Sequence, residues 1–132
     1  MNAYLWLEYR AKTSKTKGYE YYFNRGIPWL EHPEFGAFHT SEVPYVFKNL
    51  KMLDRPFTAV DTMVTNMMSS YWVNFVKTGD PNGKGLPEWR AYSERKEVMQ
   101  IGEKMGMIPI ANSQDKYDFL KEQLLKPRPV PK

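Results

Sequence analysis

The sequence predicts an α/β fold with few strands and three to four helices, and three observations support this class. A long stretch with apolar residues at helical spacing covers 59–77, an aromatic run covers 19–24, and two short apolar runs cover 97–101 and 106–110. Of the 132 residues, 42% are hydrophobic and 15% are aromatic. That content is enough for a core and is unlike the composition of a disordered chain.

The first third of the chain reads as a helix, a strand and a loop. No Gly or Pro interrupts residues 3–13, where apolar residues recur four apart, so we predict a helix there. Residues 19–24, YEYYFN, follow Gly18 and predict a strand; its apolar groups on both faces suggest the middle of a covered sheet. A loop rich in Gly, Pro and aromatic residues follows over 25–38, and then a helical turn over 41–48 with a proline in its first turn.

The longest predicted helix covers about 59–77. Thr58 and Asp61 resemble a capping pair at its start, and Gly79 with the following DPNG ends it. The expected apolar face, which we interpret as core, consists of Val60, Met63, Val64, Met67, Tyr71, Phe75 and Val76.

The C-terminal third predicts two strands and a helix. Strands 97–101 and 106–110 flank a tight turn, and a proline makes the second an edge or irregular strand. A helix over 114–125 follows, capped by Asn112 or Ser113. Its apolar face consists of Tyr117, Leu120 and Leu124.

The length suits one domain of ordinary size. We expect this domain to cover residues 1–126, and we expect residues 127–132, three of which are prolines, to form an extended tail.

Charge and composition exclude several classes of function. The net charge is +4 with scattered lysines, which fits a solvated surface better than a nucleic-acid footprint. Residues 17–24 resemble an RNA-recognition octamer but depart from it at Glu20, Tyr22 and Asn24. With no cysteine and two histidines, we expect neither a metal site nor another cofactor. No apolar run approaches the ~20 residues of a membrane span, so we expect no membrane partner, and no feature assigns a cellular compartment.

His39 stands in the stretch PEFGAFHTSEVPYVF. Taken by itself, it reads as a loop histidine bonded to backbone. The stretch FGAFHTSEVPYVF, however, resembles the histidine region of type-B carboxylesterases, the family of cholinesterases and bacterial para-nitrobenzyl esterases. YEYYFNR, YWVNFVKTGDPN, LPEWRAY and EVMQIG resemble further segments of that family in the same order, so the resemblance covers about 5–125.

The resemblance implies that residues 1–126 form a C-terminal segment of a carboxylesterase domain, with an α/β-hydrolase fold and an incomplete sheet. In that family a serine, an acidic residue and a histidine act together on a small-molecule carboxylic ester. His39 matches the histidine, which serves as general base and then general acid. His32 does not match it, and we expect a surface or loop residue there.

The resemblance also suggests roles around His39. Glu42 would support the catalytic groups through hydrogen bonds, or it would act as a carboxylate favoured at a helix N-terminus. Phe38, Phe35 and Trp29 would line the acyl or alcohol pocket, or they would pack in the core.

The 132 residues contain no Gly-x-Ser-x-Gly nucleophile motif and no paired oxyanion-hole glycines. We therefore expect no activity from this chain without an upstream segment that carries the serine and the acid, because the members of a triad act as a unit. Association with such a segment, or with itself, is the expected protein partnership. The alternative function is a non-catalytic structural or self-association domain.

Overall fold

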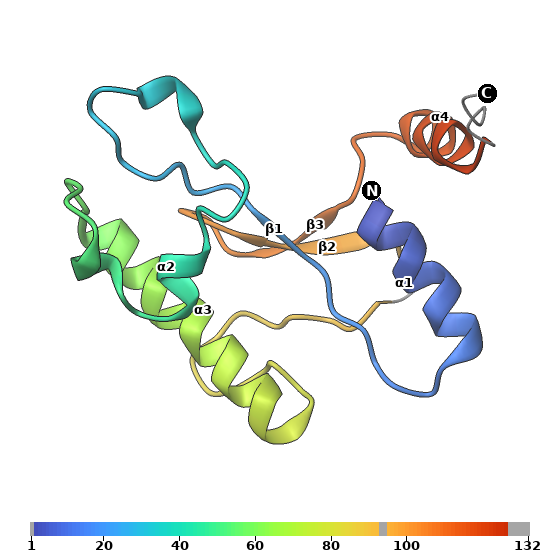
Figure 1. Cartoon of the computed structure of the whole chain (residues 1–132). Coiled ribbons are helices and arrows are strands. Elements are labelled where there is room, and N and C mark those ends of the chain that lie inside the picture. Colours follow the sequence, from blue (N-terminus) through green and yellow to red (C-terminus); the bar gives the residue numbers. More distant parts are fainter. Residues whose placement is uncertain (1, 93–94, 127–132) are drawn as a thin grey trace, which may run out of the picture. The chain divides into compact units, whose positions relative to one another are not determined.

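The computed structural model describes residues 2–92 and 95–126 (Figure 1). The α-helices are α1 (Asn2–Thr13), α2 (Val43–Val46), α3 (Ala59–Thr78) and α4 (Gln114–Leu125). The strands are β1 (Tyr21–Phe23), β2 (Glu97–Ile101) and β3 (Gly106–Pro109), and two 3-10 turns cover Pro33–Phe35 and Leu50–Met52. This inventory confirms the predicted α/β class. The expected tail, 127–132, lies outside the described residues.

The three strands form one sheet in the order β1-β2-β3. β1 runs parallel to β2, with Tyr21 opposite Met99 and Phe23 opposite Ile101. β3 follows β2 after only four residues, which is too short for a parallel crossover, so the sheet is mixed.

β1 differs from the expected covered central strand. It is shorter than predicted, it ends the strand order of the described sheet, and Tyr22 is 55% exposed. The alternation of Tyr21, Tyr22 and Phe23 gives one half-buried face and one open face, so aromatic content alone overstated its burial.

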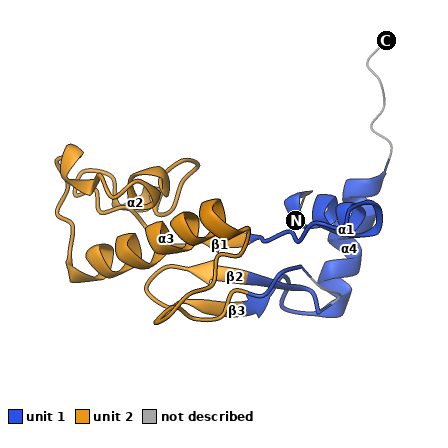
Figure 2. Cartoon of the chain, turned by 90° about the horizontal axis from the view of Figure 1, so that it is seen from below, with its two compact units in different colours: residues 1–20, 90–98, 108–132 blue, residues 21–89, 99–107 orange. Residues whose placement is uncertain are grey.

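The chain divides into two compact units, with boundaries inside β2 and β3 (Figure 2). Unit 1 comprises 1–20, 90–98 and 108–132, and includes α1 and α4. Its core is aromatic: the ring of Tyr4 meets those of Tyr92 and Tyr117 edge-on, at centroid distances of 5.2 and 6.1 Å.

Two polar contacts help to hold the helices of unit 1. The Ser113 hydroxyl accepts a hydrogen bond from the Lys116 amide, which confirms the predicted cap of α4. An ion pair of 2.8 Å joins Lys121 on α4 to Glu8 on α1.

Unit 2 comprises 21–89 and 99–107 and is built on α3. The amide and hydroxyl of Thr58 both donate to the carboxylate of Asp61 at 2.8 Å, and Gly79 ends the helix in the left-handed conformation with φ 75°. The predicted start and end of this helix are therefore confirmed.

The predicted apolar face of α3 is only partly right. Val64 and Tyr71 are buried as expected, but the buried row continues through Asp61 and Met68. The exposed members of the predicted face are Met63, Phe75 and Val76. Asp61 explains the difference, because its buried hydrogen bonds fix which side of the helix faces inward. Residues at steps of three and four from Asp61 lie on the same side and are therefore buried with it.

Within the described residues, no helix combines the length and apolar character required to cross a membrane.

Candidate active site

The loop between β1 and α2, residues 24–42, carries the residues singled out in the sequence. It begins at the carboxyl end of a strand paired in parallel, the edge of a sheet where α/β proteins place their ligand sites. Within it, the amide of Ile27 donates to the carbonyl of Gly36 at 3.2 Å, which closes the first part of the loop on itself.

His39 lies in a tight turn near the end of this loop. The amide of Ser41 donates to the carbonyl of Phe38 at 3.0 Å, so His39 and Thr40 are the central residues of the turn. Thr40 has φ 71°, a left-handed conformation that β-branched residues rarely adopt. Such a conformation persists only where the surrounding structure holds it, and here Ser41 is buried directly after it.

The His39 side chain is exposed. Within residues 2–92 and 95–126, no group hydrogen-bonds to either nitrogen of its imidazole. A general base must lie within hydrogen-bond reach of the proton that it abstracts, and the described residues leave both nitrogens of this ring available for such a contact.

Glu42 contacts the strand rather than the histidine. It is half-buried, and its Oε1 accepts a hydrogen bond from the hydroxyl of Tyr21 at 3.4 Å. Burial raises the pKa of the Tyr21 phenol, and the charge and hydrogen bond of Glu42 raise it further. Glu42 precedes α2 but makes no side-chain capping bond to that helix. The carboxylate therefore ties the end of the loop to β1.

Two of the three aromatic residues proposed for a pocket pack against each other, and the third lies apart from them. Trp29 and Phe35 pack edge-on at 5.4 Å, and His32 stacks on Phe35 at 4.8 Å. The guanidinium of Arg55 lies 3.7 Å over the ring of Trp29. Phe38 is 39% exposed and takes no part in these ring contacts.

His32 sits at the surface, as expected. Its ring is partly exposed and lies 3.2 Å from the carboxylate of Glu34. The sequence had separated it from His39 on the resemblance alone, and the aromatic packing around it is consistent with a structural role.

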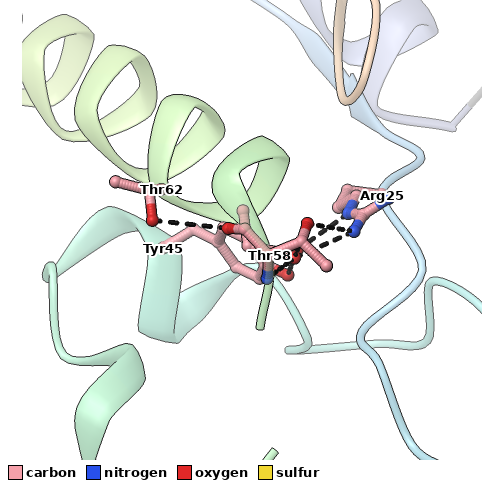
Figure 3. Close-up of polar contacts among 5 residues, drawn as sticks. Arg25, Tyr45, Thr58 and Thr62 are labelled. Atoms are coloured by element: carbon pink, nitrogen blue, oxygen red, sulfur yellow. Dashed lines mark hydrogen bonds and ion pairs between the residues drawn. The ribbon is translucent and has the colours of Figure 1, made fainter. Parts of the chain in front are cut away.

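Asp61, which the sequence identified only as part of a helix cap, is buried, and its carboxylate accepts hydrogen bonds from Arg25 and Tyr45, two of the residues labelled in Figure 3. Asp61 Oδ1 accepts from Arg25 Nε and from the Tyr45 hydroxyl, both at 2.8 Å. Its Oδ2 accepts from Arg25 Nη2 at 2.9 Å and from the amide and hydroxyl of Thr58 at 2.8 Å. Arg25 follows β1 and Tyr45 lies in α2, so this network links the start and the end of the loop to α3.

These contacts decide the charge state of the network. Burial of Asp61 opposes ionisation, but the hydrogen bonds from Arg25, Thr58 and Tyr45 outweigh it and hold the pKa of Asp61 well below its usual range. Burial raises the pKa of Tyr45, and its hydrogen bond to the carboxylate raises it further. Asp61 is thus an ionised acceptor and Tyr45 a neutral donor near neutral pH.

The sequence offered a weak signal for this network. Asp61 stands at a capping position, and Arg25 immediately follows a predicted strand, but nothing in the spacing connects them. In the described part of the chain, no cluster of three or more His, Asp or Glu side chains could hold a metal ion.

Comparison with known proteins points to the same family that the sequence resembles. The model of the carboxylesterase family matches residues 3–120. Cocaine esterase from Homo sapiens is 32% identical over 92 residues, covering 67% of this chain and 16% of that protein. Bile salt-activated lipase from Homo sapiens is 33% identical over 111 residues, covering 80% of this chain and 15% of that protein. The chain therefore spans less than a fifth of the length of either relative.

A solved structure supports the same assignment. The structure of a thermophilic PNB esterase matches with a TM-score of 0.60 and 26% identity, covering 75% of this chain and 21% of that one. The family model covers well over half of the chain, and the elements described above form part of an α/β-hydrolase fold, so this chain belongs to the carboxylesterase family.

Proposed function

We propose that this chain supplies the general base of a serine carboxylic-ester hydrolase and that His39 is that base. The observation that carries the proposal is the exposed imidazole, free of hydrogen bonds from the described residues, in a tight turn beyond the carboxyl end of β1. Membership of the carboxylesterase family supports it, because His39 lies within the matched residues.

The chemistry follows from what an imidazole side chain can do. A neutral imidazole accepts the proton of a serine hydroxyl as that oxygen attacks the ester carbonyl. The imidazolium then gives the proton to the departing alcohol, and the same ring activates water for the second half of the reaction. Glu42 would fix the end of the loop behind the histidine, and Phe38, Phe35 and Trp29 are the aromatic side chains of the same loop that we propose for contact with the ester.

The nucleophile must come from outside these 132 residues, since they contain no Gly-x-Ser-x-Gly motif. We therefore expect the chain by itself to hydrolyse no p-nitrophenyl ester. The substrate class we propose is a small-molecule carboxylic ester, and the partner is the segment that carries the serine, the acid and the oxyanion donors.

A chimera tests the role of His39. This chain would replace the matching segment of a PNB esterase, and hydrolysis of p-nitrophenyl acetate would be followed for the chimera, its His39→Gln variant and its His32→Gln variant. Loss of a triad member leaves little beyond binding and the oxyanion hole, so His39→Gln should lower kcat by at least about a thousandfold.

His32→Gln is the matched control, because it removes the other imidazole of the same loop. It should leave kcat within about twofold of the unaltered chimera, as expected for a surface residue. A chimera that keeps its full kcat after His39→Gln would show that His39 is not the base.

A second candidate is a non-catalytic self-association domain, and exposed apolar side chains favour it. In unit 1, Trp6 and Tyr9 on α1 and Phe119 and Leu125 on α4 are each more than half exposed. Exposed apolar patches mark contact surfaces, and Trp6 and Tyr9 lie about one helical turn apart on α1. Light scattering coupled to size exclusion would separate the cases: a stable oligomer supports association, and a monomer at micromolar concentration contradicts it.

A further inference from the structure

The Asp61 network contains more links than capping a helix requires. Thr58 alone supplies the local contacts at the start of α3, through its amide and its hydroxyl. Arg25 and Tyr45 add three further hydrogen bonds, between 2.8 and 2.9 Å. Arg25 lies at the start of the loop that carries His39, and Tyr45 lies in α2, directly after that loop.

We propose that Asp61, Arg25 and Tyr45 are positioning residues that fix the two ends of the His39 loop against α3 and so set the place of the imidazole. The proposal rests on the proposed role of His39 as general base. It assigns to the carboxylate of Asp61 a task in the reaction that a helix cap does not have.

The burial of Asp61 makes these links demanding. Its side chain is fully buried, so water cannot replace a missing donor. The planar fork of Arg25 meets both carboxylate oxygens, which fixes direction as well as distance. Tyr45 is also fully buried, and its ring packs 5.3 Å from that of Phe23 in β1. If Arg25 or Tyr45 shifts, the buried carboxylate of Asp61 loses a hydrogen-bond donor that water would not replace.

The path from each anchor to His39 is short. On the Arg25 side, the Ile27 amide bonds to the Gly36 carbonyl, so the chain is held again three residues before the histidine. On the Tyr45 side, the amide of Val43 bonds to the carbonyl of Thr40 at 3.2 Å. Thr40, which accepts the second of these hydrogen bonds, has φ 71°, and such a conformation persists only where the surrounding structure holds it.

Two conservative variants of the full chain test the positioning. Tyr45→Phe removes one hydrogen bond and keeps the ring that packs on Phe23. Arg25→Lys keeps the charge and loses the two-pronged contact. Either variant leaves the Asp61 carboxylate and its Thr58 contacts in place, so α3 keeps its cap.

Two control variants are matched to them. Glu97→Gln breaks the arginine–carboxylate pair of 2.7 Å between Arg90 and Glu97 in unit 1. Thr62→Ala removes a hydroxyl of α3 that donates to the carbonyl of Thr58 at 3.4 Å, within the helix (Figure 3).

The measurement is native-state amide exchange by NMR, together with the imidazole signals of His39. The chain has only two histidines, so His32→Gln assigns both rings. In Tyr45→Phe and Arg25→Lys, the amides of Ser41 and Val43 should exchange about tenfold faster, and the His39 ring signals should shift. The amides of Val64 and Met68 in α3 should keep their protection.

A merely structural role predicts a different pattern. Loss of global stability would accelerate the amides of the loop and of α3 together, and the ring signals of the folded protein would stay in place. That pattern, or loop amides no faster than in the two controls, would overturn the proposal.

The exchange pattern is independent of turnover. A chimera that stays active after His39→Gln would refute the general-base role of His39. The anchoring of the loop would then still be tested by the exchange data alone. Unchanged exchange in Tyr45→Phe and Arg25→Lys would refute the anchoring and leave the base role untouched. If both hold, the two variants placed in the chimera should lower kcat while changing KM by less than about twofold.

Discussion

Replacing Asp61 by asparagine removes one buried negative charge from unit 2 while leaving the side-chain volume almost unchanged. The carboxylate accepts five hydrogen bonds, from Arg25, Tyr45 and Thr58. The carboxamide has one oxygen to offer, and its amino group points a donor at donors. Some of these partners must therefore lose their acceptor.

The loss of unfolding free energy depends on how far water can replace the acceptor that each partner of Asp61 loses. Breaking a buried ion pair costs about 3–5 kcal/mol of unfolding free energy, since the remaining charge is left uncompensated. The Arg25 side chain is 20% exposed, so water compensates part of its loss. Tyr45 is fully buried, and its hydroxyl recovers nothing from solvent. We expect Asp61→Asn to lower the free energy of unfolding by about 3 kcal/mol at neutral pH.

The dependence on pH separates this cause from a packing defect. The folded-state pKa of Asp61 lies below its unfolded value, so the ionised carboxylate stabilises the fold above the unfolded pKa of about 3.9. That contribution is lost as the pH falls below about 4 and through the lowered folded-state pKa. Asparagine does not titrate, so the gap between the two proteins should narrow in acid.

Urea denaturation followed by circular dichroism measures the gap at about pH 7 and again at about pH 3, on either side of the unfolded pKa. Asp54→Asn is the control, because it neutralises an exposed carboxylate of the same unit. A gap below about 1 kcal/mol at neutral pH, or one that stays constant into acid, would refute the reasoning.

Two further predictions concern the hydrogen bonds that hold the segment after α3, residues 80–89. Tyr71→Phe removes a hydrogen bond of 2.6 Å to the Pro87 carbonyl and should cost about 1 kcal/mol near neutral pH. Burial raises the pKa of Tyr71 to about 12. The neutral phenol therefore stabilises the fold below its unfolded pKa of about 10, and this contribution is lost as the pH rises towards 12. Ultraviolet titration of the wild type and the variant would detect the ionisation of Tyr71. Asn82→Ala strips the amide and carbonyl of Trp89 of side-chain partners at 2.7 and 2.9 Å, so the thermal midpoint should fall by an amount equivalent to about 2 kcal/mol; a melt that matches the wild type would contradict this bridging role.

Local sequence signals predicted the elements of this chain well where one residue fixes a boundary. Thr58, Gly79 and Ser113 mark helix ends in the structure as they do in the sequence. Each of these residues satisfies backbone groups within a few positions, so no tertiary information is needed. Pro109 in the same way places β3 at an end of the strand order.

Burial was predicted less well, because it depends on contacts between distant residues. The apolar side chains of α3 surround the helix, and the pattern placed Met67 in the core, whereas Met68 is the fully buried one of the two. The choice is made by Asp61, a charged residue that an apolar pattern leaves out. Its buried hydrogen bonds to Arg25 and Tyr45 turn the row through Val64 and Met68 inward.

The candidate site shows the same division between local and distant information. The resemblance singled out His39 and Glu42, and Glu42 lies against Tyr21 at a separation of 21 residues that no spacing rule anticipates. Arg25 and Asp61 are 36 residues apart, and no spacing rule brings them together. A motif identifies the group that would react, whereas the residues that hold it in place are found only once the fold brings strand, loop and helix together.

This distinction bears on how the loop would tolerate change. Substitutions at exposed positions of the loop, such as Leu30, break no buried contact and should leave the place of His39 unchanged. Substitutions at Tyr45, or at Arg25, which is farther from His39 in sequence than Leu30 is, act through a carboxylate that no water can reach. Sensitivity in this loop should therefore follow connection to Asp61 rather than proximity to the histidine.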